Sequence, residues 1–327
     1  MGFKRTRQLK NLSLVFLFVA SCSEGIGDRG KIISAQEELT GGNCENAVRI
    51  LEGIADGSRE ARWYQTMASA EACSGSFQEP NFFTSGIKDL NVANLGRFLP
   101  AISSSSNMTA QDDVDYTSLL QAIRTLKNAG HTDSSDAGFT LDRHSEIWGA
   151  QKSVDMILQA TYMTVAALGM YMRYYGNGDA TGAKGGGSGS NTCYLDYTDT
   201  VSLAGLAVTP SVASPCVGGG SGHSDLTPDF GTLSGETLRR ACEGVTLFNM
   251  LFAFTAFVVT PDDSGELSRV DETLQVRIDA CKALVGTTAE AICSTLSQDQ
   301  CESIGQNNAT DLERYFASTF EPFHRGN

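Results

Sequence analysis

Two long segments without a charged residue limit most strongly how this 327-residue chain can fold. The first, residues 156–172, lies within a predicted helix of about 30 residues over 145–175. The second, residues 244–260, lies within a predicted helix that begins at Ser234 and ends before Pro261. Because both segments are apolar on nearly every side, each helix needs apolar neighbours all around it.

Either segment is long enough to be considered as a membrane span, which needs about 20 apolar residues. Polar residues interrupt both segments, however, and these are Gln159, Thr161, Thr164, Asn249 and Thr255. We therefore predict that the two helices form the centre of a soluble core. The simplest arrangement packs them against each other, which predicts a single domain over residues 41–327.

Helical patterns also cover most of the remaining chain, so the predicted fold is mainly α. We expect a multi-helix orthogonal or array bundle of helical hairpins around two buried central helices. Asn43 is the predicted N-cap of a helix over residues 44–54, and Ser58 that of a helix over residues 58–72. Further helices are predicted over residues 82–90, 95–102, 112–128, 264–284 and 287–296, and after a capping pair of Thr310 and Glu313.

An irregular insertion separates the two central helices. Residues 176–190 contain seven glycines, and a second glycine run follows at residues 218–220. Short apolar-polar alternations between the two runs allow a small hairpin. We predict a glycine-rich irregular loop over residues 176–231.

The charge balance argues against nucleic acid as a partner. The net charge is −14, and the first 21 residues hold four of the 24 basic residues and no acid. The rest of the chain therefore has 20 basic and 38 acidic residues, a net charge of −18. Lys and Arg supply most contacts to a phosphate backbone, so a body this acidic is not expected to bind one.

The N-terminus has the pattern of a secretory signal. Four basic residues precede an uncharged stretch over residues 11–21, which is too short to span a membrane. The stretch ends in Val19-Ala20-Ser21-Cys22, which resembles a bacterial lipobox. The resemblance covers residues 1–22 and implies a lipoprotein signal peptide over residues 1–21, with acyl chains such as palmitate on Cys22. A cleaved signal followed by an unmodified cysteine is the alternative.

The lipobox resemblance also implies a location. Several acyl chains, at about 0.8 kcal/mol per buried methylene, would hold the protein on a membrane. Ser23 stands where many lipoproteins retained in the inner membrane have Asp. We therefore expect a protein of the cell envelope, lipid-anchored to the outer membrane on its periplasmic face. Residues 22–40 are expected to form a flexible tether.

Eight cysteines remain when Cys22 is assigned to lipid, and an even number in an exported chain predicts disulfides. None has the Cys-x-x-Cys spacing of zinc or redox sites. In an antiparallel hairpin, residues equally far from the turn face each other. Turns near residues 57 and 262 then give two pairs, and the remaining cysteines give the other two. The predicted pairs are Cys44–Cys73, Cys193–Cys216, Cys242–Cys281 and Cys293–Cys301.

No group of residues predicts catalysis, a cofactor or a metal. The glycine loop lacks the Gly-Lys-Ser/Thr ending of a phosphate-binding loop. Ser221, His223 and Asp225 supply the residue types of a catalytic triad, but adjacent loop residues do not preset its geometry. Two groups of aspartates lack the twelve-residue calcium pattern, which leaves calcium only as an alternative to solvated carboxylates. These groups are Asp112, Asp113 and Asp115, and Asp179, Asp196 and Asp199.

Residues 44–77 resemble a tetratricopeptide-like helical hairpin. Ala47-x-x-x-Leu51 and then Ala61-x-Trp63-Tyr64-x-x-Met67-Ala68 look like the second helix of one repeat and the first of the next, although no 34-residue period follows. Uncharacterised lipoproteins of predatory Gram-negative bacteria have similar cysteine-containing hairpins. A groove beside this hairpin, with Trp63 or Tyr64 as aromatic anchors, is the candidate binding site. The alternative buries both rings in the core of the hairpin.

These observations predict a binding or scaffold lipoprotein and not an enzyme. Its partners would be the membrane, through the N-terminal lipid, and a protein or small-molecule ligand. One alternative is a solute-capture accessory, which resembles the tetratricopeptide lipoproteins that accompany some transporters. Another is an envelope enzyme with an unrecognised site. A deep pocket of converging carboxylates and a histidine would favour the enzyme, whereas a shallow concave helical face would favour binding.

Overall fold

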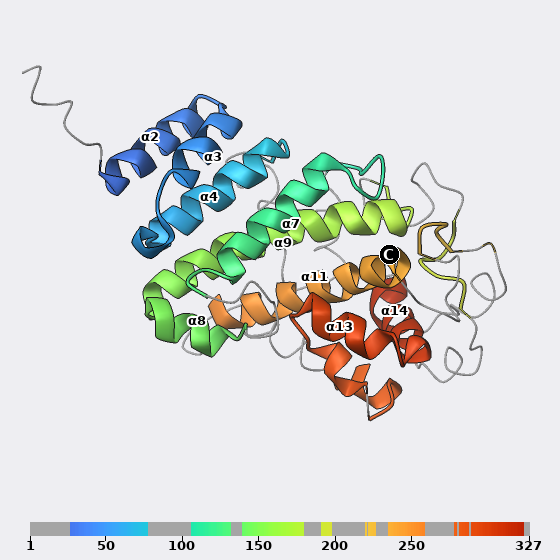
Figure 1. Ribbon diagram of the computed structural model, residues 1–327. Coiled ribbons are helices and arrows are strands. Elements are labelled where there is room, and N and C mark those ends of the chain that lie inside the picture. Colours follow the sequence, from blue (N-terminus) through green and yellow to red (C-terminus); the bar gives the residue numbers. More distant parts are fainter. Residues whose placement is uncertain are drawn as a thin grey trace, which may run out of the picture.

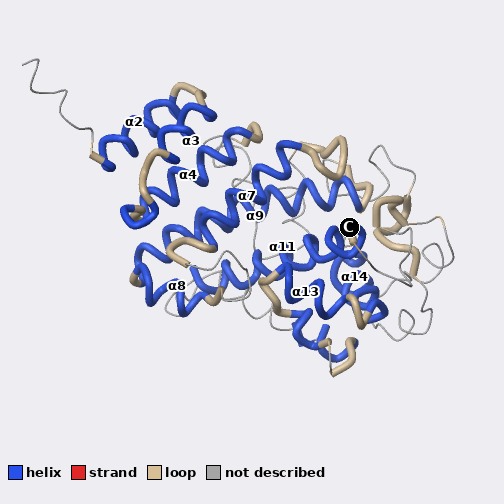
Figure 2. The backbone as a smooth tube through the Cα atoms, in the orientation of Figure 1, coloured by secondary structure: helices blue, strands red, loops and turns tan. Residues whose placement is uncertain are grey.

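The computed structural model describes residues 27–77, 106–131, 139–179, 191–197, 220, 222–226, 235–258, 278–279, 281–287 and 289–323. Within these ranges the chain forms helices and loops without a strand, which confirms the predicted mainly α fold (Figures 1 and 2). The α-helices are α2 (Asp28–Thr40), α3 (Cys44–Glu52), α4 (Ala61–Ser74), α7 (Val114–Lys127), α8 (Leu141–Trp148), α9 (Ala150–Tyr175), α11 (Glu236–Val258), α13 (Gln298–Gly305) and α14 (Ala309–Phe323). Two short 3-10 helices are η1 (Asp56–Ser58) and η6 (Glu290–Cys293).

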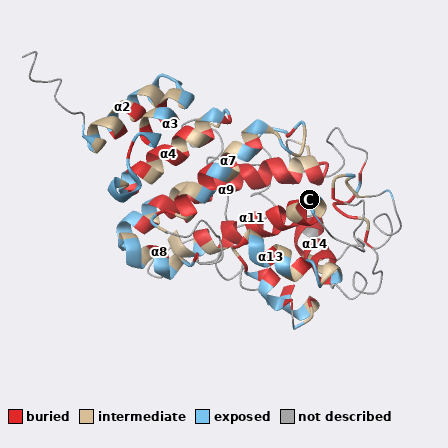
Figure 3. Ribbon diagram, in the orientation of Figure 1, coloured by how far each residue is buried: buried red, intermediate tan, exposed pale blue. Residues whose placement is uncertain are grey.

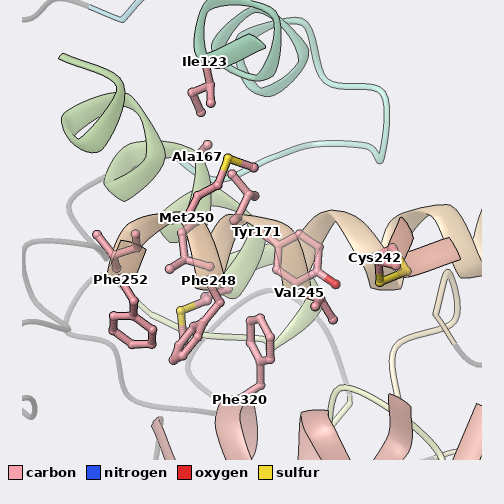
Figure 4. Close-up of a cluster of buried hydrophobic side chains, with 14 of the residues drawn as sticks. Ile123, Ala167, Tyr171, Cys242, Val245, Phe248, Met250, Phe252 and Phe320 are labelled. Atoms are coloured by element: carbon pink, nitrogen blue, oxygen red, sulfur yellow. A yellow bond between two sulfur atoms is a disulfide. The ribbon is translucent and has the colours of Figure 1, made fainter. Parts of the chain in front are cut away.

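Helices α9 and α11 pack against each other at the centre, as their uncharged segments predict (Figure 1). The helices approach so closely at Gly244 that a Cβ there would lie 2.5 Å from the Tyr171 ring. Aromatic side chains continue this contact one turn further along α11, where the Phe248 and Phe320 ring centroids lie 5.3 Å apart and Phe320 also packs against Tyr171 at 5.8 Å (Figure 4). Figure 3 shows buried residues along most of both central helices.

Helix α11 is the one described helix that is long and apolar enough to cross a membrane. In the structure, 72% of its most apolar 18-residue window is buried inside the protein. Asn249 is polar but can lie inside this core, because its amide donates to the carbonyl groups of Ile292 and Thr295 at 2.9 and 3.0 Å. The helix therefore fills the core of the described fold, as predicted.

The predicted helix over residues 145–175 is wrong at its N-terminal end. The chain forms two helices there, because Gly149 has a φ of +77°, in the left-handed region that glycine tolerates. Helix α8 precedes this break and α9 follows it. The Trp148 indole donates to the Ala129 carbonyl at 2.9 Å and so holds α8 against the end of α7.

The predicted flexible tether over residues 22–40 is also wrong from residue 28 onward, where the chain forms helix α2. The helix has a buried side, because Ile32 and Ala35 are packed against α3 and α4. Helices α2, α3 and α4 lie side by side (Figure 1) and share a small apolar core. Helix α4 also contributes to the large central core, which extends from α4 to α14.

Of the predicted N-caps, Thr310 lies inside α14, and two others do not cap their helices. Asn43 precedes α3 as expected, but its amide donates to Glu38 Oε2 at 2.9 Å and does not cap the helix. Ser58 ends η1, and α4 begins only at Ala61. In both places a nearby polar group or turn competes with helix capping. The acidic start of α7 is a true cap, because Asp113 accepts from the Asp115 N–H at 3.0 Å.

Parts of the glycine-rich segment over residues 176–231 lie outside the described residues, as do the predicted helices over 82–90 and 95–102. The described residues 191–197 of the glycine-rich segment form an irregular loop against α14. Buried Glu321 holds this loop, since its Oε1 accepts from the Tyr194 N–H at 2.7 Å and from Tyr197 Oη at 2.9 Å. Asp196 accepts from the N–H groups of Gly220 and Gly222, which joins two parts of the insertion.

Candidate functional site

Three helix ends surround an open hollow of about 750 Å³ in the N-terminal part of the fold. The C-terminal ends of α2 and α4 and the N-terminal end of α3 meet there, because Gly42, with a φ of +77°, reverses the chain between α2 and α3. The lining residues are polar apart from Gly42 and the half-buried disulfide: Glu38, Gly42, Asn43, Cys44, Glu45, Asn46, Arg49, Cys73 and Ser74. We call this feature the polar hollow.

Glu38 is the best-positioned carboxylate of the polar hollow. Hydrogen bonds from Asn46 and Asn43 lower the pKa of Glu38, and the positive charge of Arg49 acts in the same direction. The Arg49 guanidinium itself donates to the Asn46 side chain. Glu38 is therefore an ionised group held in place by two amides at the surface. The Glu38 carboxylate can therefore pair with a cation while it keeps its hydrogen bonds to the two amides.

The electrostatics of the polar hollow favour positive groups. Two carboxylates, Glu38 and Glu45, face one guanidinium, that of Arg49. Two helix C-termini, of α2 and α4, outnumber the single N-terminus of α3, and helix C-termini carry partial negative charge. Neither this hollow nor a smaller one of about 30 Å³ between α7 and α11 has a histidine among its described lining residues.

The structure does not place Trp63 where a partner could contact it. The Trp63 side chain is 4% exposed, and its indole donates to the Leu51 carbonyl at 2.9 Å. Arg59 covers the ring, with its guanidinium carbon 4.1 Å from the ring centroid. The prediction of Trp63 as a binding anchor is therefore wrong, because the helical stripe that contains it packs into the small core instead.

Tyr64 is half-buried and packs between elements. Its ring contacts Trp63 edge to face, with centroids 4.9 Å apart, and Trp148 at 5.5 Å. These contacts connect α4 with the end of α8. Neither aromatic residue lines the polar hollow, which lies at the other end of the hairpin.

The cysteines form disulfides, but not in all the predicted pairs. Cys44 is joined to Cys73, as the hairpin geometry predicts. Cys193 is disulfide-bonded, and Cys216 lies outside the described residues. Cys242 is joined to Cys301, and Cys281 to Cys293, so the predicted pairs Cys242–Cys281 and Cys293–Cys301 are wrong.

The wrong pair Cys242–Cys281 rested on a long hairpin with a turn near residue 262, and the wrong pair Cys293–Cys301 followed from the cysteines that remained. Helix α11 instead packs against α13, which brings Cys301 to the first half of α11. Cys281 and Cys293 are only 12 residues apart and close a short loop. Distance from a presumed turn predicts a disulfide only where two uninterrupted helices flank that turn, as α3 and α4 do.

The described residues of the triad-like sequence at 221–225 do not form a triad. Ser221 lies outside the described residues. His223 Nδ1 lies 3.2 Å from the Asp225 N–H, from which it accepts, and 4.0 Å from the Asp225 carboxylate. That carboxylate accepts instead from Tyr174 Oη at 2.9 Å. Burial lowers the pKa of His223, and Asp225 opposes this change.

His144 and Ser153 form a serine–histidine contact that is fully buried. His144 Nδ1 lies 3.1 Å from Ser153 Oγ, and His144 Nε2 lies 3.2 Å from the Leu126 carbonyl oxygen. Both side chains are 0% exposed, so a substrate has no access to them. Their contacts connect the ends of α7, α8 and α9, which gives the pair a role in holding these helices together.

Sequence reasoning missed a buried polar cluster where α7, α9 and α11 meet. Glu243 accepts from Arg239 at 2.6 Å, and the buried Arg240 and Tyr116 lie within 3.4 Å of its Oε2. Burial raises the pKa of Glu243, while Arg240 and Arg239 oppose this change. The spacing of Arg239, Arg240 and Glu243 at three and four residues is the signal that sequence analysis offered for this cluster.

Among the described residues, no group of three or more His, Cys, Asp or Glu side chains could hold a metal ion. Asp196, one of the aspartates considered for calcium, accepts instead from the backbone N–H groups of Gly220 and Gly222. No protein-family model, curated protein sequence or solved structure matches this chain.

Proposed function

We propose that the chain is a lipid-anchored binding protein of the cell envelope, on the periplasmic face of the outer membrane, with the polar hollow as its binding surface. The partner in this proposal is a protein or solute that presents basic groups. The observation that carries the proposal is the open hollow of about 750 Å³ with the ionised Glu38 and neighbouring Glu45 at converging helix ends. An open hollow with no histidine among its described lining residues favours binding over catalysis.

Chain length supports a position near the membrane. Only residues 23–27 separate the proposed lipid site, Cys22, from the first residue of α2. A fully extended chain covers at most about 3.6 Å per residue, so these residues span no more than about 20 Å. The α2–α3–α4 unit would then be the part of the fold nearest to the anchor. The net charge of −18 outside the signal would repel anionic headgroups and attract basic surfaces.

Removal of the two carboxylates of the polar hollow should weaken binding of a basic probe. For the double variant Glu38→Gln/Glu45→Gln, we expect the affinity for a fluorescent pentalysine peptide to fall about tenfold at low salt. The wild-type affinity should itself fall as salt rises to about 0.15 M, because salt screens exposed charges. Fluorescence anisotropy of the labelled peptide measures both effects.

The matched control is Glu146→Gln/Glu290→Gln, which removes two exposed carboxylates outside the polar hollow and makes the same change in net charge. This control should retain most of the affinity for pentalysine. If the two double variants lost affinity equally, binding would reflect net charge alone, and the polar hollow would not be the binding surface.

The anchor has a separate test. We expect Cys22→Ser to move the protein from the membrane fraction to the soluble fraction, because the acyl chains that supply the membrane affinity are lost. Ser23→Thr is the control, since it leaves the lipidated cysteine in place. Detergent-phase partitioning and the intact mass of the mature chain report the modification. An unmodified N-terminal Cys22 in the mature wild-type chain would contradict the lipoprotein proposal and leave the test of the hollow unaffected.

A further inference from the structure

The disulfide between Cys44 and Cys73 differs from the other described disulfides in its accessibility. Both of its cysteines are half-buried and line the polar hollow. The four cysteines of the pairs Cys242–Cys301 and Cys281–Cys293 are at most 3% exposed. A dissolved thiol can therefore reach the Cys44–Cys73 bond in the folded protein. The core must open before the thiol can reach the two buried disulfides.

The two sulfurs of the accessible disulfide also differ in their surroundings. Cys44 is the first residue of α3, and no side chain caps that helix N-terminus. Cys73 lies in the last turn of α4, at the negative end of a helix dipole. A helix N-terminus stabilises a thiolate, and a lower thiol pKa makes a better leaving group. Cys44 is accordingly the sulfur that leaves more easily, and Cys73 is the one that an incoming thiolate should attack.

We propose that Cys44–Cys73 is a thiol–disulfide exchange site whose reactant is a dithiol. A thiolate of the dithiol attacks Cys73 Sγ and forms a mixed disulfide. The Cys44–Cys73 bond breaks, and its electron pair goes to Cys44 Sγ, which leaves as a thiolate at the start of α3. The second thiol of the dithiol loses its proton. The resulting thiolate attacks the dithiol sulfur that is bound to Cys73 Sγ, which closes the dithiol into a disulfide and releases the Cys73 thiolate. The dithiol is oxidised to a disulfide by two electrons, and both cysteines are reduced.

This exchange would act on the polar hollow and would leave the core in place. The bond joins the start of α3 to the end of α4, so its reduction frees two of the three helix ends that form the hollow. The apolar contacts of Ile32, Leu51 and Met67 in the small core do not involve either cysteine. The proposal is independent of the proposed binding function, because it depends on sulfur access and on helix ends alone.

The first test is the order of reduction in the oxidised, folded full chain. Dithiothreitol is added for increasing times, free thiols are alkylated, and peptides are mapped by mass spectrometry. We expect alkylation of Cys44 and Cys73 to appear at least about tenfold faster than alkylation of Cys242, Cys301, Cys281 and Cys293, while the helical circular dichroism signal stays constant. Equal rates for all the pairs, or reduction of Cys44–Cys73 only after loss of the helical signal, would overturn the proposal.

The second test is the direction of attack. Reduced glutathione, which has a single thiol, forms the mixed disulfide in its first step, and alkylation before a second glutathione reacts marks the released cysteine. We expect the glutathione adduct mainly on Cys73 and the alkyl group mainly on Cys44. Asn43→Asp should slow the reaction several-fold, since it places a negative charge beside the leaving thiolate, whereas Asn43→Ser should not. An adduct mainly on Cys44, or equal rates for the two variants, would overturn the assigned direction.

Discussion

Replacement of Glu243 by Gln is expected to lower the free energy of unfolding by about 3–5 kcal/mol, because it removes the charged partner of a buried guanidinium. Arg240 is 4% exposed, and its Nε already lacks a hydrogen-bond partner among the described residues. Its remaining partner in the described structure would be Glu236, at 3.7 Å and 69% exposed. Urea unfolding of the oxidised protein, followed by circular dichroism, measures the loss.

Two further variants separate charge pairing from other effects of Glu243→Gln. Glu236→Gln removes an exposed carboxylate that contacts the same two arginines, and it should lower stability by about 1 kcal/mol or less. The double variant Glu243→Met/Arg240→Met removes both buried charges, and we expect it to be more stable than Glu243→Gln, since an apolar pair needs no counter-charge. If the double variant were less stable than Glu243→Gln, the buried pair itself would supply the stability.

The central architecture could be predicted from the sequence because it depends on a property of single segments. An uncharged, nearly wholly apolar helix must be surrounded, and only another such helix and the amphipathic helices can surround it. The Cys44–Cys73 bond could be predicted for a similar reason, since both cysteines flank one short hairpin. Local spacing was enough in each case.

The remaining disulfides and the binding surface depend on tertiary contacts that local spacing does not contain. Cys242 and Cys301 are 59 residues apart, and they meet only because α13 packs on α11. Trp63 has the same helical spacing whether its stripe faces a partner or a core. Helix α2, which was expected to be part of a tether, supplies the buried Ile32 and Ala35 that decide between these two outcomes. The polar hollow likewise exists only because three separate helix ends converge.

Acidification should destabilise the protein by about 3 kcal/mol through His144 alone. Burial is the main cause that lowers the pKa of His144 to about 4, and the nearby His131 acts in the same direction, whereas the hydrogen bond to the Leu126 carbonyl opposes it. The carbonyl oxygen can only accept, so Nε2 carries the proton of the neutral ring and Nδ1 faces Ser153. The folded structure therefore holds the neutral form.

The sign follows from which state binds the proton. In the unfolded chain His144 titrates near its ordinary pKa of about 6.5. As pH falls below that value the unfolded state gains a proton that the folded state excludes, so stability falls between about pH 6.5 and pH 4 and levels off below. The loss from this residue should reach about 2 kcal/mol at pH 5 and about 3 kcal/mol at pH 4, at about 1.4 kcal/mol per unit of pKa difference.

His144→Gln tests this assignment, because glutamine does not titrate in this range and still has an amide for one hydrogen bond. Urea unfolding at several pH values between 7 and 4 should show a smaller fall in stability for the variant than for the wild type, by the amount that His144 contributes. His223→Gln is the matched control, since burial also lowers the pKa of His223, and removal of that side chain should flatten the pH profile less. A His144→Gln profile parallel to that of the wild type would show that other groups cause the acid sensitivity. A flatter profile would identify His144, which lies on α8 and contacts Ser153 of α9 and Leu126 of α7, as a main cause of the acid sensitivity.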